Sequence, residues 1–91
     1  GVSKDYKQAF DWYSKAAEQG DAKAQYNVGF LYAMGQGVTQ NYKRSYVWFS
    51  IAAKNGSAAA IKNRDIAAKK LSPSALESAQ EEAKQLSDKI Q

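Results

Sequence analysis

The chain has 91 residues, a formal net charge of +4, 44 % hydrophobic residues and 24 % charged residues. This size and balance predict one small folded domain, and they exclude a disordered chain or a chain with two separate cores. The sequence contains neither cysteine nor histidine, which excludes disulfides, thiol nucleophiles, thiolate zinc sites and histidine-based acid–base catalysis, so no cofactor or metal is expected.

The first two helices are predicted over residues 5–19 and 22–34. In each segment the apolar residues recur at spacings of three and four, which places them on one face of a helix. Asp5 and Asp21 are the expected N-caps, and Gly20 stands where a left-handed residue ends the first helix. The apolar faces consist of Tyr6, Ala9, Trp12, Tyr13, Ala16 and Ala17 in the first helix and of Ala24, Val28, Leu31 and Tyr32 in the second.

The third helix is predicted over residues 41–55, after a loop that contains two glycines. Its apolar face consists of Tyr42, Ser45, Trp48, Phe49, Ala52 and Ala53. Trp12 and Trp48 are both interpreted as core residues, because each stands in the middle of the apolar face of its helix. Val47 and Ile51 lie on the opposite, otherwise polar side, and their position predicts that the last helix or a partner chain covers them.

Two more helices are predicted over residues 58–71 and 73–89. Pro73 suits the first position of the last helix. That helix combines a charged side with one apolar stripe, which consists of Leu76, Ala79, Ala83, Leu86 and Ile90. A terminal element with one polar face typically closes the end of a helical stack. The chain is therefore divided into repeats over residues 1–72 and a capping helix over residues 73–91.

An internal repeat organises the first two thirds of the sequence. Residues 1–24 align with residues 37–60 at an offset of 36, and 11 of the 24 aligned positions are identical. A fixed period of this length indicates a solenoid of stacked helix hairpins. Because Gly1 aligns with Gly37, which follows the first helix of a unit, the helix over 5–19 is expected to lack its own hairpin partner. We expect it to self-associate through the apolar surface that this exposes.

The repeated residues resemble the Sel-1-like repeat, in which a helix with spaced alanine, glycine and tyrosine precedes a Gly-Val loop and a helix rich in tryptophan and alanine. The residues that carry the resemblance are Ala24, Val28, Gly29, Tyr32, Gly35, Gly37, Val38, Asn41, Ser45, Trp48, Phe49, Ala52, Ala53 and Gly56. The resemblance implies an all-α, right-handed superhelix of tetratricopeptide-like hairpins that serves bacteria as a protein-interaction adaptor. It also implies a periplasmic or secreted protein. Asn41 and Ser45 depart from the acidic residue and the alanine that are usual in this pattern.

The predicted partner-binding residues lie on the helix over 22–34, on the side opposite its apolar face. They are Lys23, Tyr26, Asn27, Phe30 and Met34. If this helix lines the concave surface, as the resemblance implies, Tyr26 and Phe30 form an aromatic anchor for a peptide or protein. The alternative is that both rings pack on an adjacent hairpin.

Two functions are open at this point. The first is a non-catalytic scaffold that binds a peptide or protein, and the second is an envelope domain that binds or hydrolyses cell-wall sugars or peptides. An enzyme needs titratable groups that converge in a pocket, whereas a scaffold needs an open groove lined with aromatic and amide side chains. Neither a membrane-spanning segment nor a nucleic-acid partner is expected, because no stretch is long and apolar enough and the basic residues are interspersed with acidic ones.

Overall fold

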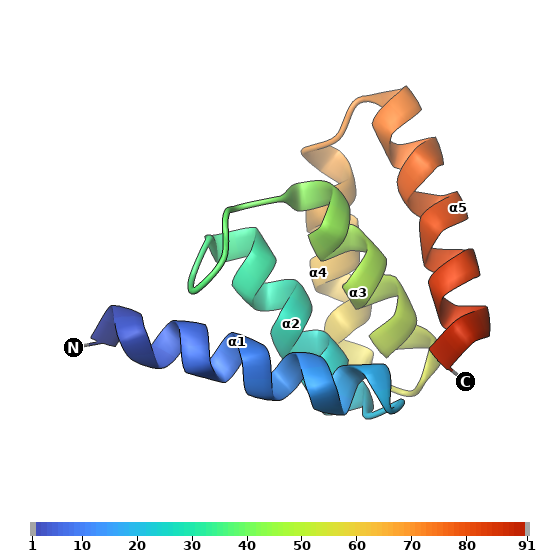
Figure 1. Cartoon of the computed structure of the whole chain (residues 1–91). Coiled ribbons are helices and arrows are strands. Elements are labelled where there is room, and N and C mark those ends of the chain that lie inside the picture. Colours follow the sequence, from blue (N-terminus) through green and yellow to red (C-terminus); the bar gives the residue numbers. More distant parts are fainter. Residues whose placement is uncertain (1, 91) are drawn as a thin grey trace.

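The computed structural model describes residues 2–90, which form five α-helices and no strand (Figure 1). The helices are α1 (Val2–Glu18), α2 (Ala22–Met34), α3 (Tyr42–Lys54), α4 (Ala58–Lys69) and α5 (Pro73–Ile90). The predicted all-α fold is confirmed. The predicted start of the first helix is wrong, because α1 already begins at Val2 and Asp5 lies inside it. Residues 2–4 include neither glycine nor proline, so nothing in them stops the helix from continuing.

Short polar side chains begin three of the helices. Asp21 Oδ1 accepts a hydrogen bond from the Ala24 N–H (3.1 Å), Asn41 Oδ1 from the Arg44 N–H (2.9 Å), and Ser57 Oγ from the Ala60 N–H (3.3 Å). Each bond satisfies an N–H group that has no partner within its own helix. These caps fix where α2, α3 and α4 begin, in agreement with the sequence pattern.

The loop between α2 and α3 packs against α1. Gly35 ends α2 in the left-handed conformation (φ 67°). Gly37 is also left-handed (φ 77°), and it lies so close to the backbone of Tyr6 in α1 that a Cβ would collide with it. Only glycine combines this conformation with this approach. The loop is therefore packed against α1.

The helices pack as a chain of neighbours, with α3 at the centre. α1 packs on α2, α2 on α3, α4 on α3, and α5 returns to lie along α3 on its other side. Figure 1 shows α1 running across the lower left while α5 stands at the right, with α3 between them. The buried residues of the centre come largely from α3, and they are Ser45, Tyr46, Val47, Trp48, Phe49, Ile51 and Ala52.

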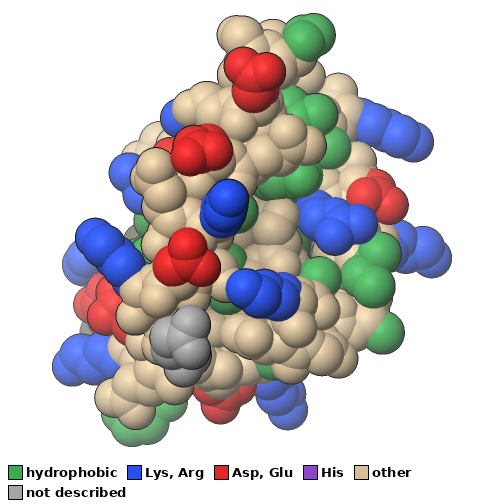
Figure 2. Space-filling model, turned by 90° about the vertical axis from the view of Figure 1, so that its right-hand side faces the viewer, with side chains coloured by type: hydrophobic (Ala, Val, Ile, Leu, Met, Phe, Trp, Pro, Cys, Tyr) green, Lys and Arg blue, Asp and Glu red, His purple; other side chains and the backbone are tan. Residues whose placement is uncertain are grey.

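The apolar pair on the far side of α3 is covered by α5. Val47 and Ile51 are buried, and they belong to one core cluster with Ala79 and Ala83 of α5. This confirms the prediction that these two residues need cover. The outer face of α5 is different, because Figure 2 shows acidic and basic side chains interspersed on that side of the molecule. The division into repeats over residues 1–72 and a capping helix over 73–91 stays a prediction.

The two tryptophans, which stand at equivalent positions of the repeat, have opposite environments. Trp48 is 9 % exposed, as predicted, whereas Trp12 is 75 % exposed, so its assignment to the core is wrong. The reason lies in the neighbours. α2 packs against the side of α3 that carries Trp48, but no helix in the part of the chain that the structure describes covers the same side of α1.

Candidate functional site

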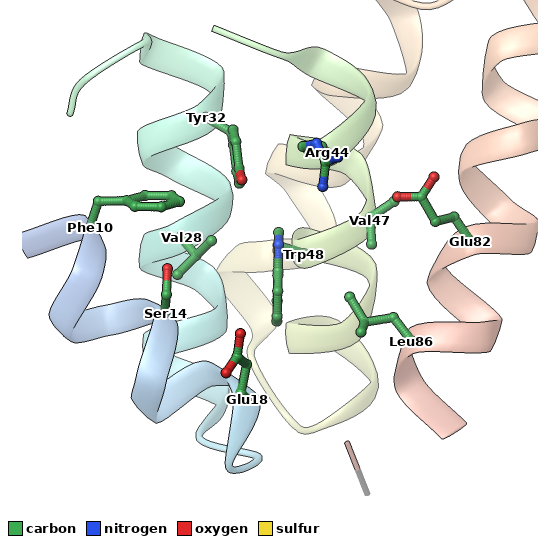
Figure 3. Close-up of a pocket in the computed structure, with 10 residues that line it drawn as sticks. All are labelled: Phe10, Ser14, Glu18, Val28, Tyr32, Arg44, Val47, Trp48, Glu82 and Leu86. Carbon is green, nitrogen blue, oxygen red and sulfur yellow. The ribbon is translucent and has the colours of Figure 1, made fainter. Parts of the chain in front are cut away.

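A cleft of about 390 Å³ lies between α1 and α5, with α2 and α3 as its floor (Figure 3). We call it the α1–α5 cleft. Its lining residues are Phe10, Ser14 and Glu18 of α1, Val28 and Tyr32 of α2, Arg44, Val47 and Trp48 of α3, and Glu82 and Leu86 of α5. The cleft thus brings together side chains from four helices.

Aromatic residues form the centre of the cleft. The rings of Phe10 and Tyr32 meet edge to face, with 5.2 Å between their centroids and an angle of 87° between their planes. Trp48 lies beside them on the floor, and Leu86 stands on the α5 side (Figure 3). Edge-to-face pairs are a preferred arrangement that holds the rings in place. The apolar part of the cleft is therefore built from side chains that the fold already fixes.

The charged residues lie around this apolar centre. Figure 3 shows Arg44 toward one end of the cleft and Glu18 toward the other. Glu82 is 3.5 Å from the Nζ atom of Lys43, but both side chains are well exposed, so this ion pair contributes little to stability. Among residues 5–90, no carboxylate lies within ion-pair distance of the Arg44 guanidinium. Arg44 and Glu18 can therefore pair with charges of a ligand.

The five predicted partner-binding residues all lie on α2, but they do not form one surface. Tyr26 packs on Phe49 of α3, with 5.5 Å between the ring centroids, and its hydroxyl accepts a hydrogen bond from Asn63 Nδ2 of α4 (3.0 Å). The alternative of packing on an adjacent hairpin therefore holds for Tyr26. Phe30 and Met34 are 40 % and 54 % exposed and stay accessible.

Of the remaining two predicted residues, Lys23 lines a hollow together with Tyr26 and Ala59. Lys23 and Asn27 also line a hollow beside the exposed Trp12, on the side where α1 and α2 meet. Neither residue lines the α1–α5 cleft. The partner-binding role of the five residues stays a prediction.

The α1–α5 cleft is not predicted by the residue pattern of the sequence. The residue spacing assigns Tyr32 and Trp48 to the apolar faces of their helices, and it singles out neither Phe10 nor the charged residues Arg44 and Glu18. A difference between the two copies of the repeat could have pointed to the cleft, because they carry different charges at the positions of Arg44 and Glu18. Arg44 aligns with Gln8, and Glu18 aligns with Lys54. The cleft itself depends on the angle between α1 and its neighbours, which the spacing of residues within helices does not report.

The described part of the chain has neither a cluster of metal-binding side chains nor a helix suited to span a membrane. Within it, no group of three or more aspartate or glutamate side chains is arranged to hold a metal ion. None of the helices there combines the length and apolarity needed to cross a membrane.

Comparisons with known proteins identify the repeat. The sequence profile of the Sel1 repeat matches residues 1–21 and 22–57. No curated protein matches the chain. Among solved structures, the chain is similar to c5321, a protective antigen present in uropathogenic Escherichia coli strains displaying an SLR fold, with a TM-score of 0.89 and 36 % identity over 93 % of this chain. The match spans only 18 % of the length of that protein. Sel1 repeats are in general a non-catalytic scaffold for protein interactions.

Proposed function

Because the chain belongs to the Sel1 repeat family, we propose that it is a non-catalytic interaction module that receives a peptide segment of a partner protein in the α1–α5 cleft. The observation that carries this proposal is the composition of the cleft, which combines an aromatic centre with Arg44 and Glu18 at opposite ends. Buried aromatic contacts supply most of the binding energy in such interfaces, and charges set orientation and specificity.

The positions of the aromatic and charged residues in the cleft determine which kind of peptide segment would fit it. An apolar side chain would pack against Phe10 and Trp48, and an acidic residue on one side of it would pair with Arg44. A basic residue on the other side would lie near Glu18. A volume of about 390 Å³ is enough for a few side chains. The proposed ligand is therefore a short acidic–apolar–basic segment.

A selection from a display library of short random peptides on the immobilised chain tests this proposal. We expect the retained peptides to share an apolar residue with an acidic residue beside it. An Arg44→Glu variant should lose the preference for the acidic residue. The matched control is Lys62→Glu on α4, because Lys62 is exposed and does not line the cleft. Absence of any enrichment, or the same enrichment on Arg44→Glu, would contradict the proposal.

The exposed residues Phe30 and Met34 of α2 form a second predicted surface for binding a peptide or protein. Phe30 and Met34 suit an apolar contact because they are accessible, whereas Tyr26 is engaged by Phe49 and Asn63. A Phe30→Ala/Met34→Ala variant removes this surface without removing a core residue. If that variant loses the selected peptides and Arg44→Glu keeps them, the partner lies on the outer face of α2 and not in the cleft.

A further inference from the structure

The turn between α3 and α4 contains the one asparagine of the sequence that is followed by glycine. Asn55 ends α3 as its C-cap, Gly56 follows with a φ of 107°, and both residues are exposed. The other three asparagines precede Val28, Tyr42 and Arg64. Because glycine has no Cβ, its backbone nitrogen is the least shielded of these neighbours. Asn55 is therefore the asparagine most open to attack by the nitrogen that follows it.

That attack converts the asparagine to an acid without an enzyme. The Gly56 nitrogen bonds to Cγ of Asn55, the Cγ–Nδ2 bond breaks, and ammonia leaves with the proton of the Gly56 N–H. Water then opens the five-membered succinimide ring. Breaking the new Cγ–N bond gives aspartate, and breaking the original backbone C–N bond gives isoaspartate. Water is the only reactant besides the chain, and it reaches this turn because both residues are exposed.

The folded turn holds the reacting groups in an unreactive geometry. The Asn55 side chain is fixed, because its Nδ2 atom donates to Gln25 Oε1 (3.0 Å), and the Gly56 N–H donates to the Ala53 carbonyl (3.2 Å). At a ψ of 13° for Asn55, the Gly56 nitrogen nearly eclipses the Asn55 nitrogen, whereas ring closure requires it to eclipse Cβ. The reaction therefore needs a local opening of the turn that breaks both hydrogen bonds.

The equivalent turn one repeat earlier is built in the same way but lacks the reactive residue. Gln19 and Gly20 stand there in place of Asn55 and Gly56. The Gly20 N–H donates to the carbonyl three residues before it (3.0 Å), as the Gly56 N–H does (3.2 Å). Glutamine has one more methylene group, so the same attack would close a six-membered ring, which forms much more slowly. The geometry of the turn thus accepts a residue that does not react.

The product of the reaction breaks the link between α3 and Gln25. A carboxylate only accepts hydrogen bonds, so at position 55 it faces the Gln25 Oε1 atom, which also only accepts. The buried Gln25 amide cannot turn around, because its Nε2 atom donates to the Ala17 carbonyl (3.0 Å). Gln25 Oε1 is then left without a donor, which destabilises the folded state. Isoaspartate also lengthens the backbone of the turn by one methylene group.

We propose that the Asn55–Gly56 bond is a site of spontaneous deamidation whose rate is set by opening of the turn between α3 and α4. Gln25 is the protecting residue, because it holds the Asn55 amide in the unreactive position. Each conversion permanently removes the hydrogen bond that joins the end of α3 to α2 and α1. The site therefore records how long the turn has been open, and it does not depend on the function proposed for the α1–α5 cleft.

Peptide mapping by mass spectrometry during incubation at mildly alkaline pH measures the conversion of each asparagine. The folded chain is compared with the same chain unfolded in guanidinium chloride. We expect Asn55 to convert first in both samples and more slowly in the folded chain. The Asn55→Gln variant should show no conversion at this turn. Equal rates in the folded and unfolded chains overturn the proposal, and so does faster conversion of another asparagine.

The Gln25→Leu variant tests the protection. It removes one hydrogen bond that opening must break, so Asn55 in the folded chain should convert about tenfold faster, with no change in guanidinium chloride. Gln80→Leu on the exposed side of α5 is the matched control. Ser57→Ala removes the cap of α4 and no core residue, and it should also accelerate conversion, which keeps the test valid if Gln25→Leu does not fold. Unchanged folded rates in these two variants contradict protection by the fold.

The Asn55→Asp variant tests the effect of the conversion. Its melting temperature should fall by several degrees, because the hydrogen bond to Gln25 is lost. Gln80→Glu adds the same charge at an exposed position of α5 and should leave the melting temperature unchanged. Chain converted by prolonged incubation and separated by ion exchange should melt like Asn55→Asp. A melting temperature of Asn55→Asp equal to that of Gln80→Glu would show that the conversion does not loosen the fold.

Discussion

Gln25 and Asn55, which are 30 residues apart in the chain, are joined by a hydrogen bond of 3.0 Å from Asn55 Nδ2 to Gln25 Oε1. The Gln25 side chain is fully buried, and its Nε2 atom donates to the Ala17 carbonyl at 3.0 Å. One amide thus connects the end of α1 to the end of α3 through α2. Both polar ends of this buried group are satisfied, which is the condition under which a buried amide stabilises a core.

Replacing Gln25 by leucine should lower the free energy of unfolding by about 1–3 kcal/mol, because the Asn55 amide loses its partner and the Ala17 carbonyl keeps only its bond from the Gly20 N–H. For a domain of this size, that loss lowers the melting temperature by several degrees. Thermal melts followed by circular dichroism measure it. Gln80→Leu is the matched control, since Gln80 lies on the exposed side of α5. Equal melting temperatures for the two variants would show that the buried amide contributes nothing.

The two tryptophans should respond differently to truncation. Trp48→Ala leaves a cavity between α2 and α3 and should cost about 3–5 kcal/mol. Trp12→Ala removes a ring that is 75 % exposed and should change stability by less than about 0.5 kcal/mol. Chemical denaturation of both variants measures the difference. A large loss for Trp12→Ala would mean that this ring is covered in solution, by self-association or by another partner.

The contact between α3 and α5 should depend on the apolar character of Ile51. Its counterpart one repeat earlier is Lys15, which is exposed. Ile51→Lys places an unpaired charge against Ala83 and should cost more than about 3 kcal/mol. Because α5 is then released, trypsin should cleave faster after Lys69 and Lys70. Ile61→Lys on the exposed side of α4 is the control.

That experiment also examines the predicted division between the repeats and the capping helix. If α5 closes the stack, Ile51→Lys should expose α3 and promote aggregation as well as unfolding. Unchanged proteolysis and stability in Ile51→Lys would show that α5 does not seal this side of the molecule.

Ser45 should be a site where a smaller residue stabilises the protein. Its hydroxyl is buried, and it has no hydrogen-bond partner among the residues that the structure describes. The counterpart in α1 is Ala9. Ser45→Ala should therefore raise the free energy of unfolding by about 1 kcal/mol, from the lost desolvation cost and from better helix propensity. Ser78→Ala, at an exposed position of α5, gains only the propensity. If both variants gain equally, the Ser45 hydroxyl is satisfied in solution.

The sequence by itself determined the helices and their order. Spacings of three and four, the N-cap Asp21, Gly20 and Pro73 predicted four of the five helices to within two residues at each end. It also determined that Val47 and Ile51 need cover, because an apolar pair on an otherwise polar side of a helix is unfavourable in water. These are local properties, or properties that one repeat shares with the next, and the chain carries them in its residue spacing.

The tertiary structure decided which of the equivalent helix faces in the two repeats is covered by another helix. Trp12 and Trp48 have the same sequence environment but opposite exposure, because α2 packs on the face of α3 that carries Trp48 and no described helix does this for α1. Tyr26 is engaged by Phe49, and Arg44 reaches a cleft that the angle between α1 and α5 opens. Burial depends on neighbours distant in the chain, and helix crossing angles follow from the packing of whole faces. No spacing within a single helix specifies either.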